Sequence, residues 1–446
     1  MSPLTDMFPE IYRYRAQEAG RVRLISGLAA ALALCAATGY SVARTTGSWA
    51  DYLSAVTFMQ FNMLVFYGAV CTARSVTQER AERTWDFQRL TPRSSFELAA
   101  GKFLGAPVFA WFLFVCLLPA ALVTLLLAPE VYGAFFSRYA LGLSLALLSM
   151  AAGLLASAYD DTGGSGMGHL SGPLIGLVCT GFLNFSFRYA QALGRPGTEP
   201  VSFYWLQLGP VSVIFFLALS FLLFAVWAFL GARYRIGRDL LERRRAWRLP
   251  AFLFFLAWYL TGFDCIPTRN GAPPLTALIL SGLAAYIAAF LSCERREYWR
   301  RWLAGGSPAR RLDDAPAWIK GAASMLLIAA ALYFVWGLLS SAGGADGRIY
   351  FILPLFLLRD LLFLQWCRFS ASRRPEMMAL ACLALAYALP MIILLPTKMT
   401  RLVAAFVPYA NDGIGAAANL AGPLAQVLIM GYLLRVKIKA VLEERL

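Results

Sequence analysis

Residues 104–128 read LGAPVFAWFLFVCLLPAALVTLLLA, an apolar run of about 25 residues without a charged side chain. A helix needs about 20 such residues to cross the hydrocarbon core of a bilayer, which is about 30 Å thick. No stretch of the chain shows the polar–apolar alternation from which a soluble domain is built. The run therefore predicts a membrane-spanning helix.

Similar runs of roughly 18–25 residues recur on both sides of this one. Together they predict an all-α polytopic membrane protein with about twelve transmembrane helices in two groups of six. The first group is expected at residues 24–43, 52–71, 104–128, 133–158, 170–187 and 208–232. The second group is expected at 250–266, 275–293, 321–339, 349–367, 377–396 and 413–434.

The composition agrees with a membrane protein. Of the 446 residues, 59% are hydrophobic and 15% are charged, whereas soluble domains average about 25% charged residues. The formal net charge is +15. The basic residues cluster at the ends of the apolar runs, which favours contact with membrane lipids and argues against a nucleic-acid partner.

The distribution of Lys and Arg predicts the orientation, because positive loops stay in the cytoplasm. If the N-terminus is cytoplasmic, the inner segments hold about 31 of the 40 basic residues and the outer loops hold about 7. One span added or lost midway would destroy this asymmetry. We therefore expect a multi-pass protein of the cell (inner or plasma) membrane with both termini in the cytoplasm.

The same reading divides the chain into four parts. Residues 1–23 are expected to form a cytoplasmic amphipathic helix, since Pro9 suits a first helical turn. Residues 24–232 form a first six-span domain, and residues 233–249 form a basic cytoplasmic linker. Residues 250–446 form a second six-span domain, which is either a diverged copy of the first or an accessory unit.

The loop between the second and third spans is the most informative one, and residues 77–102 read TQERAERTWDFQRLTPRSSFELAAGK. Its first part predicts a short helix in which Glu79 and Arg83 pair at i and i+4. Pro92 should end this helix. Ser94 and Glu97 have the spacing of a capping box, which predicts a second helix that runs into the third span.

Two readings of this loop remain open from the residues alone. Trp85, Phe87 and Leu90 would give the first helix an apolar side, and its charged residues would give it a polar side. Such a helix rests on lipid headgroups or binds a cytoplasmic partner.

This loop resembles that of permease subunits of type-2 ABC transporters. The residues that match the family pattern are Glu79, Arg80, Thr84, Leu90, Thr91, Pro92, Ser94, Glu97, Gly101 and Lys102. The sequence departs from the pattern at Arg83, where the family has Gly, and at Glu82, which is displaced by one position. The family also has short re-entrant helices between its last two spans, where residues 185–208 lie here; the residues alone equally fit an interfacial loop.

The resemblance implies that residues 79–92 form a coupling helix that seats in a separate ATPase subunit. It implies polar contacts from Glu79, Glu82 and Thr84, packing contacts from Trp85 and Leu90, and a helix end at Pro92. The permease would export a substrate with energy from ATP, and would pair with a second permease copy unless its own two halves form the pore.

No nucleotide-binding motif or catalytic cluster is present in the sequence. A phosphate loop requires Gly-x(4)-Gly-Lys-Ser/Thr, and the glycine-rich stretch at residues 163–168 has no lysine after it. His169 is the single histidine, and Asp160 and Asp161 near it fit a solvated loop. We therefore expect no enzyme, no metal site and no cofactor in this chain; ATP and Mg would bind to the partner ATPase.

Two charged residues, Arg359 and Asp360, fall near the middle of the tenth predicted span. Charges at that depth are costly and call for partners. Either the two residues pair with polar groups inside the bundle, or the span is shorter and they begin a cytoplasmic helix.

Two other functional classes compete with the exporter. A secondary transporter driven by an ion gradient would carry several buried charges along a path, and the first six spans have almost none. A membrane-embedded lipid-modifying enzyme would need paired histidines or clustered loop carboxylates, which are absent from the sequence.

Overall fold

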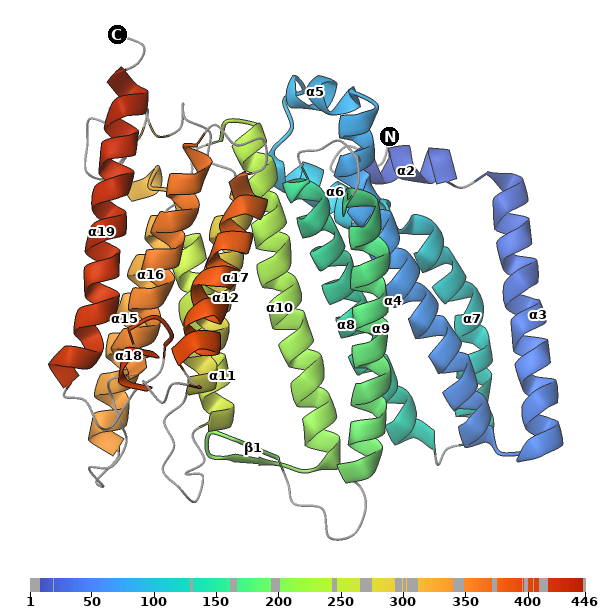
Figure 1. Ribbon diagram of the computed structural model, residues 1–446. Helices are drawn as coiled ribbons and strands as arrows, with labels where there is room; N and C mark the ends of the chain where they lie inside the picture. The colour runs from blue at the N-terminus through green and yellow to red at the C-terminus, as the bar shows by residue number, and fades with distance from the viewer. Residues whose placement is uncertain are drawn as a thin grey trace. The chain divides into compact units, whose positions relative to one another are not determined.

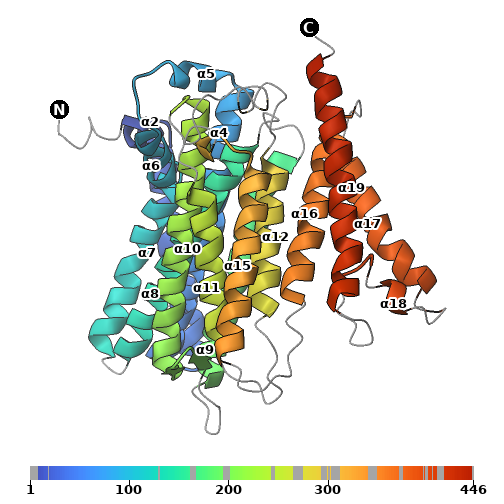
Figure 2. The same ribbon diagram turned by 90° about the vertical axis from the view of Figure 1, so that its left-hand side faces the viewer.

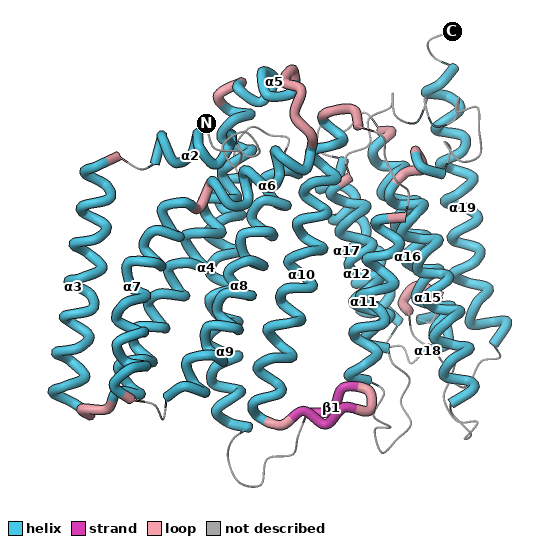
Figure 3. The backbone as a smooth tube through the Cα atoms, turned by 180° about the vertical axis from the view of Figure 1, so that it is seen from behind, coloured by secondary structure: helices cyan, strands magenta, loops and turns pink. Residues whose placement is uncertain are grey.

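The computed structural model describes residues 9–18, 20–128, 131–160, 167–193, 201–242, 247–264, 275–292, 299, 302, 312–339, 349–370, 375–394, 396, 400–403, 405–408 and 416–443. The described chain divides into two compact units. Unit 1 contains Met1–Val201 and Gln207–Arg244, and unit 2 contains Ser202–Leu206 and Arg245–Leu446. Figures 1 and 3 show that the backbone is almost entirely helical.

The helices of unit 1 are α2 (Pro9–Glu18), α3 (Arg21–Thr45), α4 (Trp49–Ala81), α5 (Thr84–Arg89), α6 (Ser95–Gly105), α7 (Val108–Leu127), α8 (Tyr132–Tyr159), α9 (Met167–Leu193) and α10 (Pro210–Asp239). The described helices of unit 2 are α11 (Arg248–Asp264), α12 (Leu275–Leu291), α15 (Ala317–Leu339), α16 (Ile349–Arg368), α17 (Pro375–Leu394), α18 (Thr400–Val403) and α19 (Ala416–Glu443). The strands β1 (Val201–Phe203) and β2 (Leu206–Leu208) pair as a short hairpin.

Ten of the described helices are long and apolar enough to cross a membrane: α3, α4, α7, α8, α9, α10, α15, α16, α17 and α19. The helices α11 and α12 are apolar but shorter, with 17 residues each. The protein is thus a multi-pass membrane protein built from helices. Helices pair most of their backbone N–H and C=O groups within the span itself, as the bilayer core requires.

Several helices extend beyond the predicted spans. The helix α4 continues ten residues past residue 71, and carries Glu79 and Arg80 on its last turns. The helix α10 likewise runs to Asp239, well beyond residue 232. Between residues 185 and 208, the described part is the end of α9 followed by the hairpin. It contains no re-entrant helix.

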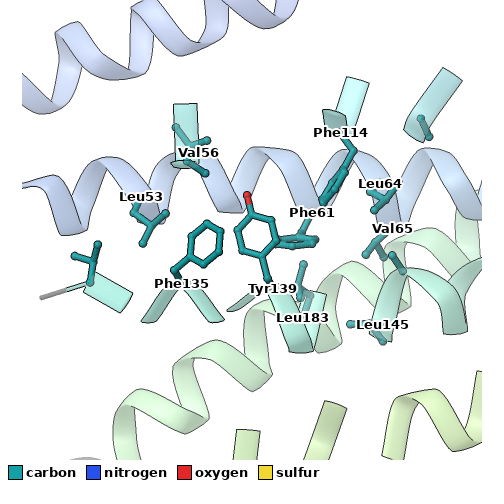
Figure 4. Close-up of a cluster of buried hydrophobic side chains, with 14 of the residues drawn as sticks. Leu53, Val56, Phe61, Leu64, Val65, Phe114, Phe135, Tyr139, Leu145 and Leu183 are labelled. Atoms are coloured by element: carbon teal, nitrogen blue, oxygen red, sulfur yellow. The ribbon is translucent and has the colours of Figure 1, made fainter. Parts of the chain in front are cut away.

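Aliphatic and aromatic side chains from α4, α7, α8 and α9 pack together in the core of unit 1 (Figure 4). The ring of Tyr139 stacks on Phe135 at a centroid distance of 4.3 Å and meets Phe61 edge-on at 5.0 Å. Its hydroxyl donates to Oε1 of Gln60 at 2.6 Å, and Nε2 of Gln60 donates to the Phe114 carbonyl at 2.9 Å. The buried side chains of Tyr139 and Gln60 are therefore partnered across helices, as burial in an apolar medium demands.

Small residues let α4 and α8 approach closely. A Cβ atom on Gly142 would come within 2.4 Å of the Phe61 ring, and one on Gly153 would come within 2.6 Å of the Ala69 carbonyl. Nearer the loop end of α4, the backbone N–H groups of Val76 and Thr77 donate to Oγ of Ser157 at 2.9 and 3.0 Å. The two helices are thus joined along their length.

In unit 2, α16 packs against both α17 and α19 (Figure 2). Leu361, Leu362 and Phe369 of α16 belong to a buried cluster that also includes Leu434 of α19. A separate buried cluster contains Leu253 of α11, Leu278 of α12, Met325 of α15 and Tyr350 of α16. The centre of α16 therefore lies inside unit 2.

Candidate functional site at the end of α4

The segment from α4 to α6 has the two helices and the break that the sequence predicted, with a shifted boundary. The first helix begins at Thr84, because Arg83 has a left-handed backbone with φ of 60° and separates α4 from α5. Glu79 and Glu82 therefore belong to the end of α4 and the turn after it. The predicted pairing of Glu79 with Arg83 along one helix is wrong for this reason.

The predicted capping box is confirmed at the start of α6. The Glu97 amide donates to Oγ of Ser94 at 3.2 Å, and the Ser94 amide donates to Oε2 of Glu97 at 3.1 Å. The next residue, Ser95, donates through its amide and its hydroxyl to Glu242 at 2.7 and 2.6 Å. The N-terminus of α6 is thus fixed by its own cap and by the segment after α10.

Glu79 is the centre of a buried polar network. Its side chain accepts from Nζ of Lys102 at 2.5 Å and from Nε2 of Gln88 at 2.8 Å, and it pairs with Arg13 of α2. Lys102 is fully buried and Glu79 is 5% exposed. The carboxylate therefore ties α4 to α2, α5 and α6 at one point.

A second carboxylate extends this network. Glu10 of α2 pairs with Arg13 at 3.0 Å and with Arg93, which lies just before α6. Glu10 is also close to Gly101 of α6, where an added Cβ would lie 2.4 Å from the Glu10 side chain. The amphipathic helix α2 is therefore held against α6 by charge and by close packing.

Burial and neighbouring carboxylates act in opposite directions on the pKa values of the two basic residues of this network, Lys102 and Arg13. Burial lowers the pKa of Lys102, although Glu79 and Glu10 oppose the shift. Burial also disfavours the charge on Arg13, but Glu79 and Glu10 outweigh it and raise the pKa of Arg13. Burial and the charge of Glu79 raise the pKa of the Tyr14 phenol. Paired and hydrogen-bonded charges of this kind hold a defined geometry, since either partner alone would be costly.

Arg80 links the same end of α4 to α8 and α10. Its guanidinium donates to the Ala158 carbonyl at 3.1 Å, to the Asp160 carbonyl, and to Oδ2 of Asp239 at 2.7 Å. Arg89 of α5 donates through Nε to the Asp239 carbonyl at 3.1 Å. The helix α5 is thus attached to α10 as well as to α4.

The Trp85 side chain lies between the two charged clusters. Its ring faces the Arg80 guanidinium at 5.7 Å and Nζ of Lys102 at 5.5 Å. It packs with Leu98 and Ile236 in a buried cluster that also contains Leu154 and Ala158 of α8. Trp85 therefore anchors α5 to the bundle by an apolar contact and two cation–π contacts.

The outer side of α5 is exposed and partly apolar. Phe87 is 73% exposed and Leu90 is 84% exposed. The two residues are three positions apart and so lie on neighbouring positions of one turn. Glu82, Arg83, Asp86 and Arg89 are exposed around them.

The six residues that the sequence predicted as ATPase contacts fall into an exposed group and a buried group. Glu82, Leu90 and Pro92 are exposed, and so is Thr84, whose hydroxyl donates to the Glu79 carbonyl at 3.3 Å. Glu79 and Trp85 instead point into unit 1. Sequence reasoning missed the partners Arg13, Gln88 and Asp239; the one available signal was the isolated Lys102 beside an apolar run.

Arg359 and Asp360 lie in the middle of α16, which continues to Arg368, so they do not begin a cytoplasmic helix. They are 7% and 6% exposed. Nε of Arg359 donates to Asp360 at 2.8 Å, and Nη1 donates to Oε1 of Gln426 at 2.7 Å. The Tyr387 hydroxyl donates to Asp360 at 2.6 Å, and Nε2 of Gln426 donates to the Ala405 carbonyl at 2.6 Å. The pair therefore joins α16 to α17 and α19.

No group of three or more His, Cys, Asp or Glu side chains that could hold a metal ion occurs among the described residues. The glycine-rich stretch lies outside the described residues up to residue 166, and so does Asp161. His169 lies in α9.

Comparison of the chain with protein-family models, with curated proteins and with solved structures finds no match.

Proposed function

We propose that the chain is the membrane-spanning subunit of an ATP-driven exporter of the type-2 ABC kind, and that a separate ATPase subunit binds at α5. The single observation that carries the proposal is the contrast between the two sides of α5. One side is fixed to four other helices through Trp85, Gln88 and Arg89, while the other exposes Phe87 and Leu90. A rigidly held helix with an exposed apolar pair is suited to docking a partner protein.

In this proposal the six predicted contact residues have two different roles. Leu90, together with Phe87, packs against the ATPase, and Glu82 and Thr84 lie at the rim of that contact. Glu79 and Trp85 position α5 from beneath. Pro92 lies after the helix, where it prevents α5 from continuing.

The mechanism follows from the attachment of α5. The helix α4 is 33 residues long and carries Glu79 and Arg80 at its loop end. A displacement of α5 by the ATPase would move α4 through Trp85 and the Gln88–Glu79 hydrogen bond. It would move α6 as well, because the buried Glu79–Lys102 ion pair resists separation. Nucleotide-driven motion is then transmitted to the spans rather than lost in a flexible loop. ATP and Mg belong to the ATPase subunit, and this chain contributes the contact surface and the moving helices.

We further propose that the chain crosses the inner or plasma membrane of the cell twelve times. Both termini then lie in the cytoplasm. The count includes α11 and α12, whose 17 residues each meet the lower bound of about 17 for a span. The ends of α2, α5 and α6 gather at one end of unit 1 (Figure 1), and their segments are rich in Arg. This distribution favours a cytoplasmic location for that end.

A second function is favoured by one specific observation. The network of Arg359, Asp360 and Tyr387 lies within the spans of unit 2, and intramembrane charges occur along the ion paths of secondary transporters. In the exporter the same network only holds α16, α17 and α19 together. Proton-dependent transport by the purified chain without an ATPase would favour this second function.

The decisive experiment is isolation of the full chain with its bound partners from its native membrane. We expect an ATPase with a phosphate loop to accompany it. The F87A/L90A double variant should lose most of that ATPase. The matched control is L126A/L127A, which removes two exposed leucines from the end of α7 that lies away from α5 and α6. Equal recovery of the ATPase with both double variants would refute docking at α5.

A further inference from the structure

Unit 1 contains a cavity of about 610 Å³ that opens to the side of the bundle between α4, α7 and α9. Its walls include Phe66 and Tyr67 of α4, Phe109 and Leu113 of α7, and Leu177 of α9. Its volume lies within the range of about 300–1,000 Å³ that is typical of small-molecule sites. Because these three helices span the membrane, the cavity opens towards the hydrocarbon chains of the lipids.

A positive charge lies beside one end of this cavity. Nη2 of Arg23, in the first turn of α3, donates to the Tyr67 hydroxyl at 2.8 Å. The Arg23 guanidinium also lies over the Phe109 ring at 4.5 Å. Both of these contacts are to side chains that line the cavity. A guanidinium is the side chain best suited to a phosphate oxygen pair, and it stacks on aromatic rings while it binds.

The cavity surface is almost wholly apolar, and two residues with polar side chains lie at its other end. Asn62 of α4 and Thr180 of α9 line it. The Thr180 hydroxyl is buried and has no hydrogen-bond partner among the described residues. A buried hydroxyl without a partner is costly, and an acceptor on a bound molecule would remove the cost.

The directions of α4 and α9 show which of the lining residues lie deeper in the membrane, as measured from the α5 side. Along α4, Asn62 precedes Tyr67 by five residues, or about 7.5 Å at 1.5 Å per residue. Along α9, which starts at the same side as the end of α4, Thr180 lies deeper than Leu177. The cavity thus has apolar walls, the Arg23 guanidinium beside it towards the α5 side of unit 1, and the Thr180 hydroxyl deeper in the membrane.

We infer that this cavity binds one anionic phospholipid from the leaflet on the α5 side. Its phosphate would lie at Arg23, an ester carbonyl would accept from the Thr180 hydroxyl, and an acyl chain would occupy the walls formed by Phe66, Leu113 and Leu177. The charge on Arg23 selects an anionic lipid over a zwitterionic one. This inference holds whether or not the chain works with an ATPase.

The test is lipid binding by the purified full chain, measured by native mass spectrometry with added phosphatidylglycerol or phosphatidylcholine. We expect one tightly held phosphatidylglycerol and no equivalent phosphatidylcholine. Arg23→Gln should weaken phosphatidylglycerol binding about tenfold, since a charge-assisted bond is lost. Arg21→Gln is the matched control, because Arg21 is an exposed arginine two residues away.

Two further variants separate the cavity from general surface charge. Leu113→Trp should fill the cavity and abolish the tight binding, and its thermal unfolding should be compared with that of the parent protein. Thr180→Val keeps the shape and should weaken binding several-fold. Equal losses in the Arg21 and Arg23 variants, equal binding of both lipids, or unchanged binding in the well-folded Thr180 variant would each overturn the inference.

Discussion

Nζ of Lys102 donates to Oε2 of Glu79 at 2.5 Å, and both side chains are buried at the point where α4, α5 and α6 meet. The two residues are 23 positions apart in the chain. Their pairing joins the long membrane helix to the helix that follows the exposed loop. If α5 receives motion from a partner, the Gln88–Glu79 hydrogen bond passes it to α4, and this ion pair carries it on to α6.

Lys102→Met should destabilise the protein by about 3–5 kcal/mol, because it leaves the Glu79 carboxylate buried with fewer partners. The double variant K102M/E79L should recover a large part of the loss, since neither charge then remains. Thermal unfolding of the two variants and of the parent protein in detergent measures both effects. A single variant as stable as the parent protein would contradict a role for this pair.

Alkaline pH should weaken the attachment of α2. Burial and Glu79 raise the pKa of Tyr14 above 10.0, its value in the unfolded chain. Above pH 10 the unfolded chain releases this proton and the folded chain retains it, so the stabilisation is complete below pH 10 and is lost as pH rises further.

Tyr14→Phe should therefore reduce the loss of stability between pH 9 and pH 11. The melting temperature as a function of pH measures this, and Tyr12→Phe is the control because Tyr12 is 61% exposed. The same pH dependence in both variants would show that Tyr14 is not responsible.

Arg80→Gln should loosen α5 without unfolding the bundle. It removes the bond to Asp239 and the two bonds to carbonyls at the end of α8. We expect faster amide hydrogen exchange in α5 and in the last turn of α4, measured by mass spectrometry. Glu82→Gln is the control, because its described partner is Gln78 on the same helix. Unchanged exchange in α5 would mean that Trp85 and Gln88 suffice to hold it.

Gly142→Ala should destabilise unit 1 by about 1–3 kcal/mol through overpacking, since the new methyl group would overlap the Phe61 ring. Gly181→Ala offers the opposite case: nothing lies within 4 Å of the added atom in the middle of α9. It should leave stability unchanged or raise it by up to about 1 kcal/mol. Thermal unfolding of both variants tests how closely α4 and α8 approach.

Arg359→Met should destabilise unit 2, because it leaves Asp360 in the membrane without its cation. The R359M/D360L double variant should restore stability if the pair only holds helices together. Transport or ATPase measurements on the double variant then distinguish the two proposed functions. Loss of proton-dependent transport in a stable double variant would favour the secondary transporter.

The sequence by itself determined that this is a multi-pass helical membrane protein, because a long apolar run has few stable alternatives to a membrane helix. It also determined local features such as the Ser94–Glu97 cap, which depends only on residues three positions apart. The helices α4, α9 and α10 cover most of the residues predicted as spans but run further along the chain, since the polar end of a helix resembles a loop in sequence.

Only the tertiary structure decided the directions of the side chains at the candidate site. The left-handed turn at Arg83 and the packing of α2 on α6 bring Arg13 to Glu79 across 66 positions of sequence. These contacts turn Glu79 and Trp85 inward and leave Phe87 and Leu90 outward. A pattern of neighbouring residues cannot specify such an outcome, because each side chain goes where a distant partner compensates its burial.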